Sequence, residues 1–394
     1  MDNQEYVKLG EQYVMNTYAR FPLAPVKGSG CYLWDADGKK YLDFLSGIAV
    51  NSLGHCHPAL VEAVQKQAEI LWHTSNLYWV PQQIELAEKL VKLSGLGRAF
   101  FCNSGTEANE AAIKLVRKYF YRQQKNKYEI IVFNQSFHGR TLGALTATAQ
   151  KKYQEGFAPL LPGFQYADFN DLDSVKKLIN DNTAAIMLEA IQGEGGIYPA
   201  EPQFLAGIKE LAENHDLLLI FDEVQAGMGR TGHFFAYEAF GIKPDIVTMA
   251  KAVAGGFPMG VMLASEQAAT GFMPGDHAAT FGGNPLASAV GNTSVDIISD
   301  PAFLAKVQAI GAELLQGLSA LQDDRISSIR AFGLMIGIQF NCEVRPLVEM
   351  LLDRGFIAGM AGPTVVRLVP PLIIGAEEVK QAVAFLKEGL ADWK

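Results

Sequence analysis

From about residue 55 onward the chain alternates short apolar runs with amphipathic helical segments, and no other feature restricts its fold as strongly. The strand-like runs are Arg98–Cys102, Glu129–Phe133, Ala184–Leu188, Leu217–Phe221, Asp245–Met249 and Gly260–Leu263. Helical segments such as Asn109–Tyr119 and Pro202–Asn214 separate several of them. Short apolar strands separated by helices are typical of a mostly parallel sheet with helices on both faces. The sequence therefore predicts the α/β class.

The two ends of the chain follow different patterns, and 394 residues are enough for two or more domains. Near the N-terminus, Asp37-Gly38 separates two strand-like runs within residues 30–45, which predicts a hairpin. The large region after it begins with two predicted amphipathic helices, Val61–Leu71 and Gln83–Leu93. The C-terminal part has predicted helices at Pro301–Gln322, Val344–Arg354 and from Ala376 onward, and predicted strands at Arg330–Phe340 and Thr364–Val369. We expect an N-terminal segment at 1–50, a large domain at 51–285, and an α+β region at 286–394 that forms a smaller domain with the N-terminal segment.

Composition excludes several classes of function. The net charge is −9, from 33 basic and 42 acidic residues, and no long basic cluster suggests a nucleic-acid surface. No apolar run approaches the roughly 20 residues that span a bilayer, and the polar N-terminus is unlike a signal peptide. Four widely separated cysteines fit reduced thiols. We therefore expect a cytoplasmic protein with neither a nucleic-acid nor a membrane partner.

The run His55-Cys56-His57 raises the possibility of a metal site. Adjacent residues rarely converge on one ion, Pro58 follows directly, and no second ligand pair has suitable spacing. The sequence therefore predicts no metal centre.

Polar residues follow five of the predicted strands at the point where each strand ends. They are Asn103–Glu107, Ser136–Thr141, the set Glu189, Gln192 and Glu194, Asp222–Gln225, and Lys251. Ligands of open α/β sheets bind beyond the carboxyl ends of the strands. We therefore expect these groups to meet at one edge of the sheet.

Lys251 is the only charged residue between Asp245 and Glu266. Burial lowers the pKa of a lysine, and the neutral amine that results can attack a carbonyl and form a Schiff base. The alternative is a lysine whose stem lies on apolar surface while its amine reaches water.

Three features elsewhere in the sequence supply groups that could act together with this lysine. Ser104–Glu107 has the S-x-x-E pattern of a capping box, and a helix N-terminus can bind a phosphate, although an ordinary cap has the same pattern. Asp222 follows an apolar strand and could hold a protonated ring nitrogen, while Phe137 offers a flat face for stacking. Together with Lys251, these groups describe a site for pyridoxal phosphate.

A competing motif is Gly227–Gly232, which has the G-x-G-x-x-G pattern of a dinucleotide site. Such glycines must leave a strand directly and open a helix, but Asp222–Ala226 intervenes and no long helix follows. A nicotinamide-dependent dehydrogenase is therefore the disfavoured alternative.

Several ordered motifs are distributed along the chain at consistent spacing. They are Asn103–Lys114 (NSGTEANEAAIK), Ser136–Thr141 (SFHGRT), Glu189–Gly196 (EAIQGEGG), Phe221–Gln225 (FDEVQ), Gly229–Gly232 (GRTG), Lys251, Thr280–Pro285 (TFGGNP) and Val366–Pro371 (VRLVPP). The chain resembles the class III pyridoxal-phosphate aminotransferases of fold-type I. This resemblance implies transfer of the terminal amine of an N-acylated ornithine, such as N2-acetyl-L-ornithine, to 2-oxoglutarate in arginine biosynthesis.

The resemblance also implies residue roles. Lys251, Asp222 and Glu189 would be catalytic, with Lys251 holding the cofactor covalently. The expected cofactor-binding residues are Ser104, Gly105, Thr106, Phe137, His138, Asp222, Glu223, Val224, Gln225, Lys251 and Thr280. Thr280 would reach the phosphate of a neighbouring subunit, which implies a homodimer with shared active sites. Arg140 and Arg367 would bind substrate carboxylates, with Glu194 covering Arg367 while the amino donor is bound.

The sequence departs from the family pattern at Ala190, where proline is frequent, and at Ala279, where a substrate-associated serine usually stands. The resemblance places Ala279 among the substrate-binding residues, but alanine lacks the hydroxyl through which that serine would contact the substrate. Alternatives within the fold are transamination of ornithine, succinylornithine or 4-aminobutyrate, and a glutamate-semialdehyde type of aminomutase.

Overall fold

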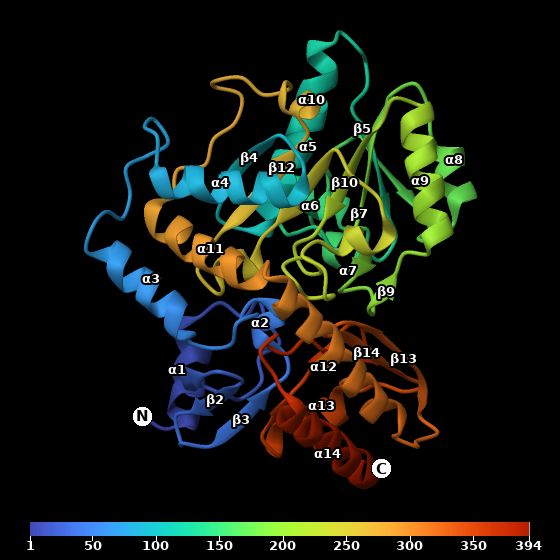
Figure 1. Cartoon of the computed structure of the whole chain (residues 1–394). Helices are drawn as coiled ribbons and strands as arrows, with labels where there is room; N and C mark the ends of the chain where they lie inside the picture. The colour runs from blue at the N-terminus through green and yellow to red at the C-terminus, as the bar shows by residue number, and fades with distance from the viewer. Residues whose placement is uncertain (394) are drawn as a thin grey trace.

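The computed structural model describes residues 1–393 and is built around a seven-stranded sheet (Figure 1). In spatial order its strands are β4 (Arg98–Cys102), β12 (Gly260–Ala264), β11 (Ile246–Met249), β10 (Leu218–Asp222), β7 (Thr183–Leu188), β5 (Glu129–Phe133) and β6 (Phe164–Ala167). Strand β12 runs antiparallel to both of its neighbours, and the other neighbouring pairs are parallel. The expected mostly parallel α/β sheet is confirmed.

Alternate side chains of each strand enter different apolar cores, because successive side chains of a strand point to opposite faces. In β10, Leu219 and Phe221 pack with α9 (Pro202–Asn214) and α4 (Pro81–Ser94) in one core. Leu218 and Ile220 pack in the other core with α5 (Gly105–Arg122). A strand buried on both faces must be apolar throughout, which explains the continuous apolar run seen in the sequence.

A smaller unit combines the two ends of the chain. The predicted hairpin is confirmed as β2 (Tyr32–Asp35) and β3 (Lys40–Asp43), with β15 (Phe356–Ile357) parallel to β3. Leu42 and Phe44 share a core with residues of α12 (Pro301–Ser319), α13 (Arg345–Asp353) and α14 (Ala376–Asp392). Figure 1 shows these N-terminal and C-terminal segments side by side below the large sheet.

One predicted strand is wrong. The run Arg330–Phe340 is a hairpin of β13 (Ile326–Phe332) and β14 (Met335–Phe340), which pairs in turn with β17 (Val365–Leu368). The turn contains Gly333 at φ +53°, and a Cβ there would lie 2.6 Å from the carbonyl carbon of Thr231. Only glycine fits this close approach between distant backbones, and the flanking apolar residues conceal the turn in the sequence.

Helix α11 (Pro285–Ile298) packs with the large unit. Its residues Ala287, Val290, Val295 and Ile298 share a core with the central sheet, and Figure 1 shows α11 beside α3 (Pro58–Ala68) and α4. The chain first enters the core of the smaller unit in α12. We propose that the boundary between the two units lies near Asp300 and not at residue 285.

The remaining elements are short or peripheral. They are α1 (Asn3–Tyr13), β1 (Pro25–Ser29), α2 (Ser46–Ala49), α6 (Leu142–Ala147), α7 (Lys151–Gln154), α8 (Leu172–Leu178), β8 (Ile191–Gln192), β9 (Tyr198–Pro199), η1 (Ala236–Phe240), η2 (Lys251–Ala254), α10 (Glu266–Ala269) and β16 (Gly359–Met360). None of the helices within residues 1–393 has the length and apolar content required to cross a membrane.

Candidate active site

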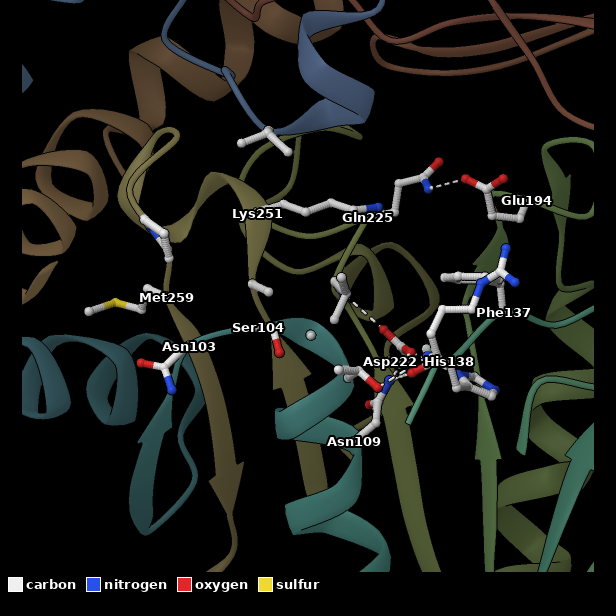
Figure 2. Close-up of a pocket in the computed structure, with 18 of the residues that line it drawn as sticks. Asn103, Ser104, Asn109, Phe137, His138, Glu194, Asp222, Gln225, Lys251 and Met259 are labelled. Atoms are coloured by element: carbon white, nitrogen blue, oxygen red, sulfur yellow. Dashed lines mark hydrogen bonds and ion pairs between the residues drawn. The ribbon is translucent and has the colours of Figure 1, made fainter. Parts of the chain in front are cut away.

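The strand ends of the large sheet surround a cavity of about 390 Å³ (Figure 2). Five separate strand ends contribute to its lining, through Ser104 after β4, Phe137 after β5, Glu189 after β7, Asp222 at the end of β10 and Lys251 after β11. These five residues are the groups that the sequence pattern led us to expect at one edge of the sheet. Their convergence follows from the parallel strand direction.

Lys251 begins the short helix η2 with a φ of +50°, which is uncommon for a residue other than glycine. Its side chain extends into the cavity toward Gln225 (Figure 2). Burial lowers the pKa of Lys251 to about 8, against the opposing charge of Glu194, because removal of water disfavours the ammonium form. At neutral pH this amine therefore has a much larger neutral fraction than a surface lysine.

Asp222 is buried and held in place by three donors. Its Oδ2 accepts from Nδ1 of His138 at 2.7 Å and from Nδ2 of Asn109 at 2.8 Å, and its Oδ1 accepts from the Val224 N–H at 3.0 Å. A carboxylate only accepts, so His138 must carry a proton on Nδ1. Because Oδ1 has only one of these donors, it can still accept a bond from a ligand in the cavity.

Two members of this network were missed by the sequence reasoning. Asn109 lies on the buried face of α5, and its Oδ1 accepts from Oγ1 of Thr248 on β11 at 2.6 Å. The signal available for Asn109 was a polar residue on a helix face otherwise formed by Ala108, Ala111 and Ala112.

The charge state of His138 depends on Asp222. Burial opposes a positive charge on His138, but the hydrogen bond to Asp222 and the negative charge of Asp222 outweigh this effect and raise the pKa of His138.

The N-terminus of α5 offers free backbone donors to the cavity. The Ser104 hydroxyl accepts from the Glu107 N–H at 3.3 Å and donates to Oε2 of Glu107 at 2.9 Å, so this side chain is committed to the cap. A Cβ on Gly105 would lie 2.8 Å from Cγ1 of Val224, so a side chain at this position would collide with Val224. Oγ1 of Thr106 accepts from the backbone N–H groups of Arg140 and Thr141 at 3.2 and 3.3 Å. Such a terminus suits an anion.

Glu189 connects the segment that carries the Phe137 ring to the loop that carries Glu194. Its two carboxylate oxygens accept from the backbone N–H groups of Phe137 at 3.1 Å and Gly193 at 3.2 Å. Burial raises the pKa of Glu189 to about 7, and the charge of Asp222 adds to this shift while that of His138 opposes it. Glu189 therefore keeps a proton to a higher pH than an ordinary glutamate does, and it holds the backbone that carries the Phe137 ring.

The two arginines expected to bind carboxylates differ in their surroundings. Arg367 is buried on β17, and its Nη1 donates to Oε1 of Glu194 at 2.5 Å and to Oε1 of Gln225 at 3.3 Å. Burial opposes charge on Glu194, but the charge of Arg367 and this hydrogen bond outweigh it and lower the pKa of Glu194. Arg140 is exposed at the cavity, with its guanidinium carbon 4.0 Å from the ring centre of Tyr153.

Four of the expected site residues lie outside the cavity lining. Arg367 is one of them, although its ion-pair partner Glu194 does line the cavity. Glu223 accepts instead from the backbone N–H groups of Ala236 at 2.8 Å and Tyr237 at 3.0 Å, because adjacent side chains at a strand end point in opposite directions. Ala279 and Thr280 lie on a loop beyond the cavity, where Thr280 is exposed. Sequence reasoning did not identify Val50 or Gly256–Met259, which also line the cavity.

These groups fit pyridoxal phosphate. The anchored carboxylate of Asp222 suits a protonated ring nitrogen, and the Phe137 ring suits a heteroaromatic face. The α5 terminus suits the phosphate, and the Lys251 amine suits the aldehyde.

The pKa of Lys251 can be measured by its reactivity. In protein freed of cofactor, labelling of Lys251 by trinitrobenzenesulfonate should rise with pH to a midpoint near 8, because only the neutral amine reacts. Exposed lysines of the same chain serve as the internal control, and their labelling should rise near pH 10.4. Peptide mapping by mass spectrometry gives the rate at each site. A Lys251 midpoint that coincides with the exposed lysines would contradict the burial argument.

Comparison with known proteins gives the same family. The class-III aminotransferase family matches residues 13–390 of the chain. The acetylornithine aminotransferase of Caldanaerobacter subterraneus is 49% identical over 386 residues, which cover 97% of this chain and 98% of that protein.

Solved structures share the fold. An ornithine aminotransferase of Toxoplasma gondii, with partial occupancy of PLP at its active site, superposes with a TM-score of 0.95 at 30% identity and covers 99% of this chain and 94% of its own. The N-acetylornithine aminotransferase of Stenotrophomonas maltophilia superposes with a TM-score of 0.85 at 37% identity and covers 98% of each chain. The chain therefore belongs to the class-III aminotransferases, which depend on pyridoxal phosphate, and both the fold-type I architecture and the family resemblance found in its motifs are confirmed.

Proposed function

We propose that the protein transfers the terminal amine of N2-acetyl-L-ornithine to 2-oxoglutarate, giving N-acetyl-L-glutamate 5-semialdehyde and L-glutamate. The observation that carries this proposal is the unequal surroundings of two arginines: Arg140 lines the cavity and is exposed, whereas Arg367 is buried and paired with Glu194, which lines the cavity. The relative from Caldanaerobacter subterraneus, at 49% identity, is an acetylornithine aminotransferase, which supports the same amino donor.

The covered arginine solves a problem of charge. A substrate that reacts at a terminal amine has no carboxylate beside its reacting carbon, whereas 2-oxoglutarate has one there. A bare cation at Arg367 would attract the wrong end of the amino donor, and Glu194 prevents this by neutralising it. When 2-oxoglutarate binds, its carboxylate replaces that of Glu194, and the planar fork of arginine suits this exchange.

The chain's own residues supply binding and proton transfer. When bound, pyridoxal phosphate withdraws electrons from the carbon that carries the substrate nitrogen, which makes the proton on that carbon acidic. Nζ of Lys251, whose neutral fraction is increased by burial, accepts that proton and later returns it. Asp222 keeps the ring nitrogen protonated, His138 and Asn109 hold Asp222, and Phe137 orients the ring. Arg140 binds the distant carboxylate of either substrate.

A panel of amino donors tests this function. We expect kcat/KM with 2-oxoglutarate to be highest for N2-acetyl-L-ornithine and lower for succinylornithine, ornithine and 4-aminobutyrate. Free ornithine carries an additional α-ammonium, and 4-aminobutyrate lacks the acylated carbon altogether. A preference for ornithine would contradict the assignment, and turnover without any oxoacid would indicate an aminomutase.

We also propose a homodimer. Segments 72–79 and 279–282 lie together, since Nδ2 of Asn76 donates to the carbonyl oxygens of Ala279 at 3.1 Å and Gly282 at 2.9 Å. Both segments expose large apolar side chains, at Trp72, Leu77, Tyr78, Trp79 and Phe281. An exposed apolar patch of this kind marks an interface. In a dimer built on this surface, Thr280 would approach the second copy's cavity.

Removal of Arg367 should affect the two substrates differently. Arg367→Ala should raise the apparent KM for 2-oxoglutarate by about 30-fold or more, because loss of a buried charged partner costs about 2 kcal/mol or more. The KM for N2-acetyl-L-ornithine should change far less, since Glu194 already neutralises Arg367 in that complex. The exposed Arg345, replaced by alanine, is the control for loss of a cation. Equal effects on both substrates would count against the role of Arg367.

A charged residue in the apolar patch should separate the subunits. Trp79 is 88% exposed, and Trp79→Asp should shift the protein from dimer to monomer in sedimentation velocity because it would bury a carboxylate in an apolar interface. Cofactor retention should fall in parallel if Thr280 acts across the interface. Tyr121→Asp, at another exposed aromatic residue, is the matched control. Wild-type protein that sediments as a monomer would refute the homodimer.

A further inference from the structure

Arg230 is a buried cation that the proposed reaction does not use. It is 1% exposed and lies in the loop Gly229–Gly232, which follows the cavity residues Asp222, Val224 and Gln225. Burial alone lowers the pKa of Arg230, to about 9, and no carboxylate of residues 1–393 forms an ion pair with it. At neutral pH the guanidinium stays charged, so its burial is costly unless neutral oxygens satisfy it.

Three oxygens from distant parts of the chain accept from this guanidinium. Nη1 donates to the carbonyl oxygens of Leu334 at 3.1 Å and Pro370 at 2.5 Å, and Nη2 donates to Oγ of Ser52 at 3.2 Å. The Leu334 N–H also donates to the carbonyl oxygen of Arg230 at 3.0 Å. One side chain thus contacts the loop after α2, the β13–β14 turn and the loop after β17.

The contact with Pro370 matters because Pro370 lies in the loop directly after β17, only three residues beyond Arg367 on that strand. The segment is fixed on its other side as well. The Val369 N–H donates to the Phe44 carbonyl at 2.8 Å, and the Leu372 N–H donates to the Ser52 carbonyl at 2.6 Å. Ser52 therefore contacts Arg230 through its side chain and the Arg367 segment through its backbone.

From this geometry we infer that Arg230 is a positioning residue. It sets the distance from Arg367 to Glu194 and Gln225, and thereby the affinity of Arg367 for the carboxylate beside the carbonyl of the oxoacid substrate. This inference rests on the proposed role of Arg367 as a carboxylate clamp. Arginine suits the position because its five donors lie in one plane and reach several acceptors at once. A displacement of about 1 Å at Arg367 would suffice to weaken a bidentate contact strongly.

The test measures ligand binding and does not depend on turnover. Glutarate has the two carboxylates of the oxoacid without its carbonyl, and pentanoate has the same chain length with one carboxylate. Calorimetry on the cofactor-loaded enzyme gives Kd for both. Arg230→Met should raise the Kd for glutarate by about tenfold and leave the Kd for pentanoate within about twofold. Arg230→Lys should bind glutarate better than Arg230→Met, because it keeps a cationic donor at this position. It should not restore the full affinity, because one ammonium group reaches fewer of the three oxygens than a guanidinium does.

A double-mutant cycle separates positioning from general destabilisation. If Arg230 acts through Arg367, then Arg230→Met should add no further loss of glutarate affinity in an Arg367→Ala background. A full additional loss there, or equal weakening of both ligands in the single variant, would overturn the inference. Should Arg230→Met fail to fold, Ser52→Ala decides alone. Selective weakening of glutarate by Ser52→Ala supports the inference, and equal or absent effects on both ligands refute it.

Failure of the proposed function has its own signature in the same data. If Arg367→Ala leaves glutarate affinity unchanged, the clamp role is wrong and the inference falls with it. If Arg367→Ala weakens glutarate and Arg230→Met does not, the clamp role stands and the inference about Arg230 alone is refuted.

Discussion

Substrate selection in the proposed reaction depends on the ion pair between Arg367 and Glu194. This pair joins a strand of the smaller unit to a loop of the large sheet, at 2.5 Å, and it lies close enough to influence Lys251. The charge of Arg367 lowers the pKa of Lys251, whereas that of Glu194 raises it. Movement of Glu194 away from Arg367 would therefore lower the pKa of Lys251 further, and in the proposed reaction it would also free Arg367 for a substrate carboxylate.

The rest of the structure holds these groups in register. Parallel strands bring five chain segments to one edge, and buried networks around Asp222 and Glu189 restrict the side chains there. Glu189 is notable because its two oxygens hold the backbone of the Phe137 plate and of the Gly193 loop next to Glu194. The groups proposed to hold the cofactor and those proposed to select the substrate are thus mechanically connected.

Much of this arrangement could be predicted from the sequence, because it depends on local patterns. Buried parallel strands need continuous apolar runs, so the bounds of β4 and β5 agree with the prediction, and the strand ends identified Lys251 and Asp222. Features that depend on distant partners could not be predicted. The turn at Gly333 exists because the backbone of Thr231 is near, Asn109 is informative only beside Asp222 and Thr248, and Arg230 is recognisable only by its three distant acceptors. Glu223 shows that adjacency to a site residue does not place a side chain in the site.

Single-turnover kinetics of Glu194→Gln test the central claim most directly, with each half-reaction followed separately through the cofactor absorbance. Glutamine keeps the shape of Glu194 but cannot neutralise Arg367. The account predicts that the half-reaction with N2-acetyl-L-ornithine slows by about tenfold or more, consistent with about 1.4 kcal/mol for a lost charge interaction, while that with 2-oxoglutarate is unchanged or faster. Equal slowing of both half-reactions, or an unaffected donor half-reaction, would contradict it.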